Sequence, residues 1–432
     1  MAQPHGMVNA ESGGGVLALW SEHRERLAGF SRLLAGEAGR LLFSLVYFVT
    51  LAKVLPLDQF GIFASASAVG VVLARVSAFG FNSPLYRIAT TKPSLLGSYT
   101  AGYLCAVLLT LPIVLAAIWG IHATLYGSLI ALSTFALIVL TEAVLWRTLE
   151  VNITVQHGLD RFGVASGMAI AGGGAKAAAA LWFAASGEPD LERWAVINAV
   201  AVGVTAAIGT LLFWPRRRLS WHPRGWLGRV RDAMGVSGAE ALFYVQSDLD
   251  RLLVLKLGGE ALAGLYAIVM RLADLTAMPM RAANVMLVQW IMRGRRSGTT
   301  VSKRVLVEIA IAATSAAALG AMAVALHVLP EWFGPSIALA ATVLGLMLAV
   351  PAFRNLLEYH TELLYAHEAM ATRVALLAVL TVAKALGLWW VLSEAGDFAT
   401  VALRLNLAFA ILWVLSALVT YRRIGSGEQA AQ

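Results

Sequence analysis

The sequence is poor in charged residues, which make up 13% of its 432 residues, whereas hydrophobic residues make up 59%. Soluble domains carry about 25% charged residues, so a water-soluble fold of this composition could not cover its surface with polar groups. The mean hydropathy of +0.74 points the same way. The shortage of charge excludes the soluble classes of protein and indicates an integral membrane protein.

Cysteine is nearly absent, because Cys105 is the single one, and this excludes an internal disulfide. Its place in an apolar run is typical of a small buried side chain. The sequence also lacks HExxH, CxxC and paired-histidine spacings, Walker motifs and GxSxG. We therefore expect no metal, no cofactor and no catalytic residues, and a protein that is not an enzyme. The first 30 residues lack the apolar core of a signal peptide, so none is expected.

Long apolar segments are what the sequence has instead. A membrane-spanning helix needs about 20 predominantly apolar residues. Twelve segments meet this requirement and predict an all-α, polytopic membrane protein. The predicted spans are 33–54, 60–80, 98–119, 123–145, 164–185, 194–214, 236–257, 261–288, 305–328, 336–356, 372–392 and 399–420.

The positive charges predict how these spans are oriented. Most of the 33 lysine and arginine residues fall in the N-terminus, the even-numbered loops and the C-terminus. Only Lys53, Arg193 and Lys256 lie in or beside the odd-numbered loops. Because positive loops stay in the cytoplasm, both termini are predicted to be cytoplasmic. The net charge of +8 is then a topology signal and not a nucleic-acid footprint, since the cations are spread over many segments.

An internal repeat relates the two halves of the chain. An offset of 203 residues aligns the first predicted span with the seventh without a gap. The matches include Glu37 with Glu240, Ser44 with Ser247, Lys53 with Lys256 and Gly61 with Gly264. A duplication of six spans predicts two lobes of the same orientation, related by an axis along the membrane normal, with the substrate path between them.

The repeat also predicts the domain limits. We expect a cytoplasmic N-terminal segment, an N-terminal six-helix lobe, a basic cytoplasmic linker, a C-terminal six-helix lobe and a cytoplasmic tail. Their predicted ranges are 1–32, 33–214, 215–235, 236–421 and 422–432, respectively.

Charged residues inside the predicted spans are the candidate site. Each cation costs roughly 2.5–3.5 kcal/mol at a helix centre, so it should face a wet cavity or a partner. The predicted substrate-cavity residues are Arg40, Arg75, Lys176, Arg251, Arg271 and Arg281, and the predicted ion-coupling carboxylates are Asp248, Asp250 and Asp274. Such a cationic cavity would attract an anionic head group, above all a phosphate or pyrophosphate.

Structural roles for the same residues remain open. The charges could pair with one another and fix helix packing, as Asp274 could with Arg271 one turn away. Arg75 and Arg281 could extend to the cytoplasmic interface, and Arg404 could extend outward. Lys384 lies near the middle of a span, and the sequence suggests no partner for it.

Two segments resemble a known family. The run KVLPLDQFGIFA from Lys53 to Ala64 resembles the start of polysaccharide repeat-unit flippases, the Wzx-like branch of the multidrug/oligosaccharidyl-lipid/polysaccharide (MOP) exporter superfamily. The run from Asp248 to Ala267, DLDRLLVLKLGGEALAGLYA, and RLADLTAMP from Arg271 resemble the seventh and eighth helices of that branch. The specific likeness covers about 35–95 and 236–290.

The resemblance implies a V-shaped pair of six-helix lobes in the bacterial inner membrane. It implies a monomer that turns undecaprenyl-pyrophosphate-linked oligosaccharide from the cytoplasmic to the periplasmic leaflet, for exopolysaccharide, capsule or O-antigen synthesis. Membrane lipid, a polysaccharide polymerase and a chain-length regulator are the implied partners. Relatives that flip the peptidoglycan precursor place cavity arginines comparably to Arg40, Arg75 and Arg271, but they usually have fourteen spans, which argues against that role here.

Three other functions compete with the flippase. An ion-coupled drug or metabolite antiporter of the same superfamily would prefer an anionic cavity for cationic drugs, whereas cations dominate the predicted spans. A membrane polymerase or ligase would need catalytic residues on a sizeable extracytoplasmic loop, and the predicted outer loops are short. A structural partner in an export complex would not need so many buried charges.

Overall fold

The structure is a computed structural model that describes residues 39–187, 189–292, 301–328, 333–393 and 398–430. Within these ranges every regular element is a helix, as expected where a bilayer offers no partners to backbone groups. The first half comprises a helix at 39–54, α2 (Leu57–Val76), η1 (Ser77–Gly80), α3 (Asn82–Thr91), η2 (Pro93–Leu95), α4 (Leu96–Ile121), η3 (His122–Tyr126), α5 (Leu132–Leu140), η4 (Thr141–Trp146), α6 (Arg147–Gly158), α7 (Phe162–Ala185) and α8 (Leu191–Phe213). The second half comprises α9 (Pro223–Leu227), α10 (Val230–Met292), α11 (Val301–Val328), α13 (Pro335–Leu344), η6 (Gly345–Met347), α14 (Ala349–Ala366), α15 (Met370–Ser393) and α16 (Phe398–Ala430).

The helices of the described ranges are long enough to cross a membrane many times. Nine of them are long and apolar enough to span it, or ten if α13 and α14, which meet at a 70° bend, form one broken span. α10 counts once in that number, although its chain turns at Gly259 (φ 80°, ψ 177°) into two arms. The helix at 39–54 begins at the first described residue and is not among these nine. This arrangement is compatible with the twelve predicted crossings.

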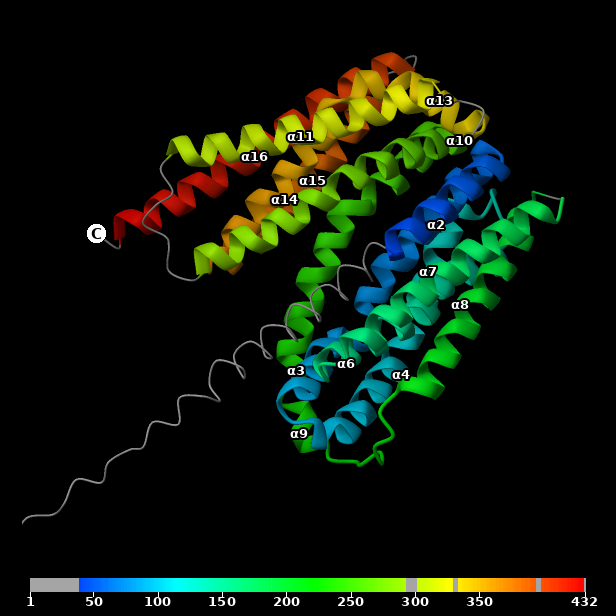
Figure 1. Cartoon of the computed structure of the whole chain (residues 1–432), viewed down its shortest axis with the longest axis vertical. Coiled ribbons are helices and arrows are strands. Elements are labelled where there is room, and N and C mark those ends of the chain that lie inside the picture. Colours follow the sequence, from blue (N-terminus) through cyan, green and yellow to red (C-terminus); the bar gives the residue numbers. More distant parts are fainter. Residues whose placement is uncertain (1–38, 188, 293–300, 329–332, 394–397, 431–432) are drawn as a thin grey trace, which may run out of the picture.

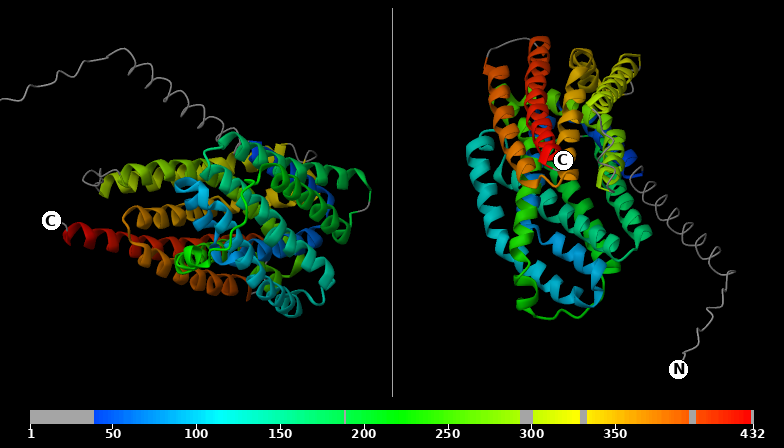
Figure 2. Two further views of the ribbon diagram at one scale, coloured as in Figure 1. Left: turned by 90° about the horizontal axis from the view of Figure 1, so that it is seen from below. Right: turned by 90° about the vertical axis from the view of Figure 1, so that its left-hand side faces the viewer.

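The helices form two groups joined by α10 (Figure 1). α2 to α8 pack among themselves, and α11 to α16 do likewise. The first arm of α10 starts beside α3 and η1 in the N-terminal group, and the second arm packs with α11, α13 and α14. The right-hand view of Figure 2 shows the green first arm of α10 reaching into the N-terminal group. This is the two-lobe arrangement predicted from the sequence.

Glycines let the two lobes approach where α2 crosses α10. A β-carbon on Gly61 would lie 2.3 Å from the carbonyl oxygen of Glu260. A β-carbon on Gly264 would lie 2.0 Å from the carbonyl oxygen of Leu57. The 203-residue offset exchanges these two contacts, because it carries the first glycine onto the second and Leu57 onto Glu260. Contacts exchanged in this way are those of a two-fold axis, so the repeat read from the sequence has a structural counterpart at the crossing.

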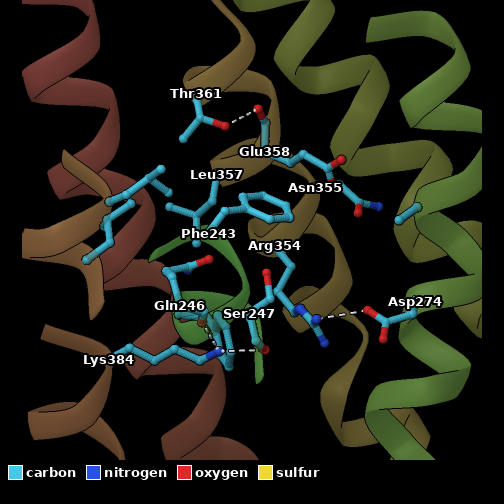
Figure 3. A pocket seen from close by; sticks show the side chains of 14 residues that line it. Phe243, Gln246, Ser247, Asp274, Arg354, Asn355, Leu357, Glu358, Thr361 and Lys384 are labelled. Atoms are coloured by element: carbon cyan, nitrogen blue, oxygen red, sulfur yellow. Dashed lines mark hydrogen bonds and ion pairs between the residues drawn. The ribbon is translucent and has the colours of Figure 1, made fainter. Parts of the chain in front are cut away.

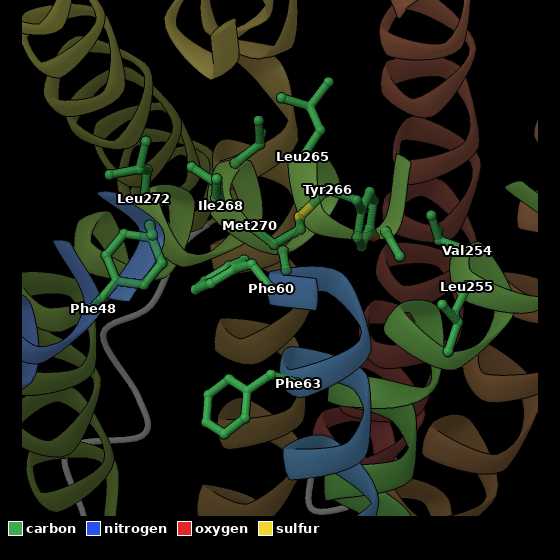
Figure 4. Packing of buried hydrophobic residues seen from close by; sticks show 14 of the residues in the cluster. Phe48, Phe60, Phe63, Val254, Leu255, Leu265, Tyr266, Ile268, Met270 and Leu272 are labelled. Carbon is green, nitrogen blue, oxygen red and sulfur yellow. The ribbon is translucent and has the colours of Figure 1, made fainter. Parts of the chain in front are cut away.

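Buried aromatic and aliphatic side chains surround this crossing (Figure 4). Phe48 of the first helix and Phe60 of α2 are in edge contact, with ring centres 5.9 Å apart. They belong to one cluster with Ile268 and Met270 of α10, which are fully buried. Lipid tails are as apolar as these side chains, so the gain here comes from close packing and not from removal of water.

Several helix limits differ from the predicted ones. The fourth span was predicted at 123–145, but the helix runs from Leu132 to Gly158 through α5, η4 and α6. The prediction stopped too early because Glu142, Arg147 and Glu150 reduce the mean hydropathy, whereas the structure satisfies these side chains with ion pairs. The tenth span, predicted as 336–356, is the bent pair α13 and α14.

The Gly264 contact gives a first test of the lobe crossing. Gly264→Ala would push a methyl group into the Leu57 carbonyl, and overpacking of this kind costs about 1–3 kcal/mol. We expect a lower thermal unfolding midpoint in detergent and a longer spin-label distance between α2 and the second arm of α10, measured in a Cys105→Ala background. Gly320→Ala is the control, since its methyl group would meet only the Leu348 side chain at 3.7 Å. Equal behaviour of the two variants would contradict the crossing.

Candidate functional site

A polar cavity lies between the two lobes. It has a volume of about 380 Å³ and is lined by the first helix, α2, η4 and α7 from one lobe and by α10 from the other. Its charged lining residues are Arg40, Glu142, Lys176, Arg251 and Arg271. Four cations thus face one carboxylate among the described lining residues. Aromatic rings complete the wall, notably those of Tyr47, Phe60, Phe63 and Trp146.

Arg271 is less compensated by nearby charge than Lys176 and Arg251 of the same cavity. It lies on the second arm of α10, and its Nη2 donates a hydrogen bond to Ser44 Oγ of the first helix. In the ranges that the structure describes, no ion pair is recorded for its guanidinium group. A guanidinium group that faces a cavity and contacts a neutral hydroxyl keeps its charge and most of its donors for an anion. The hydrogen bond also links the two lobes across the cavity.

Lys176 of α7 is held at the cavity wall by two neighbours. Its Nζ lies 2.8 Å from Glu142 Oε1 and 4.0 Å from the ring centre of Trp146. A run of three glycines, 172–174, lets α7 approach the first helix beside it, because a β-carbon on Gly173 would lie 3.3 Å from Phe43 of the first helix. This approach brings Lys176 into the same cavity as the first helix.

Arg251 connects the cavity to a polar network inside the C-terminal lobe. Its Nη1 lies 3.1 Å from Asp248 Oδ1, and its Nη2 lies 3.7 Å from Asp274 Oδ2. Asp274 in turn lies 2.8 Å from Arg354 of α14. Both side chains line a small cavity of about 50 Å³ (Figure 3). The suggested pairing of Asp274 with Arg271 is therefore replaced by pairing with Arg251 and Arg354.

Asp250 points to the other side of α10 and is almost fully buried. Its Oδ2 lies 2.9 Å from Lys384 Nζ and accepts a hydrogen bond of 2.8 Å from the Tyr266 hydroxyl. Lys384 also donates to the backbone carbonyls of Gln246 and Ser247, at 2.7 and 3.2 Å (Figure 3). The lysine for which the sequence suggested no partner thus has three acceptors.

Arg75 does not line the central cavity. Its Nη1 lies 3.2 Å from Glu150 of α6, and its guanidinium group lies 4.2 Å from the ring centre of Tyr244 on the first arm of α10. Arg147 joins the same group, 2.9 Å from Glu150 and 3.9 Å from Glu240 of α10. These contacts fasten the first arm of α10 to the N-terminal lobe, which is a structural arrangement and not the predicted cavity position.

The other candidate residues from the sequence are not among the described lining residues of the central cavity. Arg281 lies in the part of α10 whose side chains are outside the described residues. Asp248, Asp250 and Asp274 do not line the central cavity, and each is ion-paired. Sequence reasoning missed Glu142, Arg147, Glu150 and Arg354, because it placed the helix limits too near them. In the described ranges, no group of three or more His, Cys, Asp or Glu side chains could hold a metal ion.

Comparison with known proteins identifies the fold. No protein-family model and no curated protein matches the sequence. Solved structures do match: a multidrug resistance MATE family transporter of the MOP superfamily in its inward-facing conformation has 13% identity, covers 91% of this chain and 96% of its own, and gives a TM-score of 0.62. The chain has the fold of the MOP-superfamily transporters.

Two further structures support that conclusion. A MATE protein in complex with MaD3S has 12% identity over 92% of this chain and 95% of its own, with a TM-score of 0.58. A MOP superfamily transporter from Pyrococcus furiosus, described as having a binding pocket of reverse polarity, has 12% identity over 91% of this chain and 94% of its own, with a TM-score of 0.55. The likeness spans nearly the whole of each chain, and at these identities it concerns the fold.

Proposed function

We propose that this chain is an alternating-access transporter that flips an undecaprenyl-pyrophosphate-linked oligosaccharide across the bacterial inner membrane. The observation that carries the proposal is the cationic cavity between the lobes, where four cations face one carboxylate among the described lining residues. A diphosphate attracts these groups through charge-assisted hydrogen bonds. Aromatic rings in the same wall offer faces on which sugars can pack.

The contacts between the lobes indicate at which side of the membrane this cavity is closed. The crossing at Leu57 and Gly264 lies beside the predicted periplasmic loops, 55–59 and 258–260. On the predicted topology, the lobes are therefore joined at the periplasmic side. Rocking of one lobe against the other would open the cytoplasmic side and the periplasmic side alternately, which is the movement expected of two repeats around a shared site.

A direct transfer assay tests the proposal. The full chain would be reconstituted into vesicles with a fluorescent polyprenyl-diphosphate oligosaccharide, and its movement between leaflets measured by quenching from outside. We expect faster transfer of this lipid than in protein-free vesicles, and no faster transfer of a neutral polyprenyl glycoside. In cells, loss of the protein should cause lipid-linked repeat units to accumulate. Equal transfer of both lipids would contradict the flippase.

An ion-coupled antiporter of drugs or metabolites is the second candidate. Its support is a group of three carboxylates, Asp248, Asp250 and Asp274, which could exchange a proton or sodium ion for a cationic substrate. Asp250 is buried and the other two are partly buried. Their pairing with Arg251, Lys384 and Arg354 weighs against it, because each carboxylate already has a cationic partner. We keep these three residues as proposed coupling sites for either substrate.

Glu142→Gln separates the two candidates by which of two ligands, pyrophosphate or ethidium, binds and responds to the change. The change removes the one carboxylate among the described lining residues and leaves Lys176 unpaired, so the cavity becomes more positive. We expect pyrophosphate to bind about fivefold tighter and ethidium to bind weaker, measured by calorimetry on purified protein. Glu362→Gln is the matched control, because Glu362 also has a cationic partner at 2.8 Å, Arg373, but does not line the cavity. Binding of ethidium that Glu142→Gln weakens, with no detectable binding of pyrophosphate to either form, would favour the antiporter.

A further inference from the structure

A second basic cavity lies in the N-terminal lobe and shares no lining residue with the central one. It has a volume of about 280 Å³ and is formed by the start of α4, the turn between α6 and α7, the end of α8 and the segment that follows it. The loop from α8 to α9 passes this end of the lobe (Figure 1). Its polar lining consists of three arginines, Arg161, Arg216 and Arg217.

These arginines have their charge available. In the described part of the chain, none of the three has a recorded ion pair or side-chain hydrogen bond. Arg161 is also the N-cap residue of α7, and no side chain caps the first turn of that helix. The uncapped backbone N–H groups add a partial positive charge at the same place. Asp160 precedes Arg161 but does not line the cavity.

Hydrogen bonds and close backbone packing stabilise the walls of this cavity. Gln156 of α6 donates a hydrogen bond of 2.7 Å to the carbonyl oxygen of Phe213, and Asn152 donates one of 2.9 Å to that of Gly209. These bonds fix the end of α8 to α6. A β-carbon on Gly97 would lie 2.3 Å from the carbonyl oxygen of Arg218, so the segment after α8 lies directly against α4. The three arginines therefore project from a built site.

An apolar stripe leads away from the cavity along the outer face of α8. Val200, Val204, Ile208 and Leu211 follow one another at helical spacing and are 50% to 73% exposed. In a spanning helix, side chains exposed in this way face lipid tails. At the mouth of the cavity the stripe continues into Leu212, Phe213 and Trp214, which belong to its lining. Positive charge and a lipid-facing stripe thus meet at one point.

We propose that this cavity binds an anionic phospholipid. The phosphate would lie among Arg161, Arg216 and Arg217, and an acyl chain would lie along the α8 stripe. A soluble anion would make no use of the stripe, and a zwitterionic lipid would bring an unfavourable cation to the arginines. The predicted cytoplasmic position of the 215–235 segment places the cavity where anionic head groups attract basic residues. The proposal is independent of what the central cavity transports.

Native mass spectrometry of the purified full chain tests the proposal. The detergent-solubilised protein would be titrated with phosphatidylglycerol, with phosphatidylcholine of the same chains, and with inorganic phosphate. We expect saturable binding of phosphatidylglycerol only. Arg216→Gln with Arg217→Gln should weaken this binding about 30-fold. Arg161→Gln, on a separate segment, should weaken it about fivefold, and it serves if the double variant does not fold.

A control with the same loss of charge separates a site from general attraction. Arg87→Gln with Arg422→Gln removes two exposed arginines outside the cavity. Phosphatidylglycerol binding should then stay within about twofold of the wild-type value. Three results would overturn the proposal: equal losses in the two double variants, equal binding of phosphatidylcholine, or binding of inorganic phosphate as strong as that of the lipid.

Discussion

Arg271→Ala should slow transfer of a diphosphate-linked lipid by roughly 10- to 100-fold, because it removes a charge-assisted contact of about 1.5–3 kcal/mol. Loss of Arg271 leaves no carboxylate unpaired among the described residues, since its recorded contact is the Ser44 hydroxyl. We therefore expect normal protein levels and a nearly unchanged thermal unfolding midpoint. In cells, the corresponding result is a loss of surface polysaccharide with the protein still in the membrane.

Companion variants show whether charge or geometry matters at this position. Arg271→Lys should keep part of the activity, because it retains the charge but loses the planar fork that binds two phosphate oxygens. Arg422→Ala, an exposed arginine outside the cavity, should have no effect. Arg251→Ala is a poor probe, since it would leave Asp248 and Asp274 with less compensation. Unchanged transfer in both Arg271→Ala and Arg40→Ala would refute the cationic cavity.

Part of this site follows from the sequence by one physical rule. A cation inside a span must face water or a partner, and Arg40, Lys176, Arg251 and Arg271 all line the cavity between the lobes. The repeat could also be predicted from the sequence, because one offset aligns several residues of the two halves. Residues close to a two-fold axis meet their own equivalents, so such an alignment has a structural test. Gly61 and Gly264 were aligned by the offset, and they lie against each other at the crossing.

The rest of the site could not be read from the sequence because it depends on pairs between helices. A hydropathy window treats Glu142, Arg147 and Glu150 as a reason to end a span. In the structure each of them has a partner on another helix, which makes it acceptable within the span. The same limitation hid the role of Arg75. The position of Arg75 within its own helix does not reveal its contact with Tyr244, because Tyr244 belongs to the other half of the sequence.

Lys384→Met should destabilise the C-terminal lobe by about 3–5 kcal/mol, because it leaves the Asp250 carboxylate buried without its cation. The side chains of Lys384 and Asp250 are only 3% and 2% exposed and lie 2.9 Å apart. The loss should appear as a lower unfolding midpoint in detergent. Arg373→Met provides the comparison, since its pair with Glu362 is more exposed and should contribute less than about 1 kcal/mol. Equal losses in the two variants would contradict a buried pair.

Combining Lys384→Met with Asp250→Asn separates a packing role of this pair from ion coupling. The double variant removes both charges, so most of the stability lost in Lys384→Met should return. If Asp250 only fixes α10 to α15, gradient-driven transfer in vesicles returns together with stability. If Asp250 carries the coupled ion, stability returns while acceleration by an imposed proton or sodium gradient stays absent. Because Tyr266 donates to Asp250 and an asparagine carbonyl can still accept that hydrogen bond, the Asn variant keeps the local geometry and makes charge the variable tested.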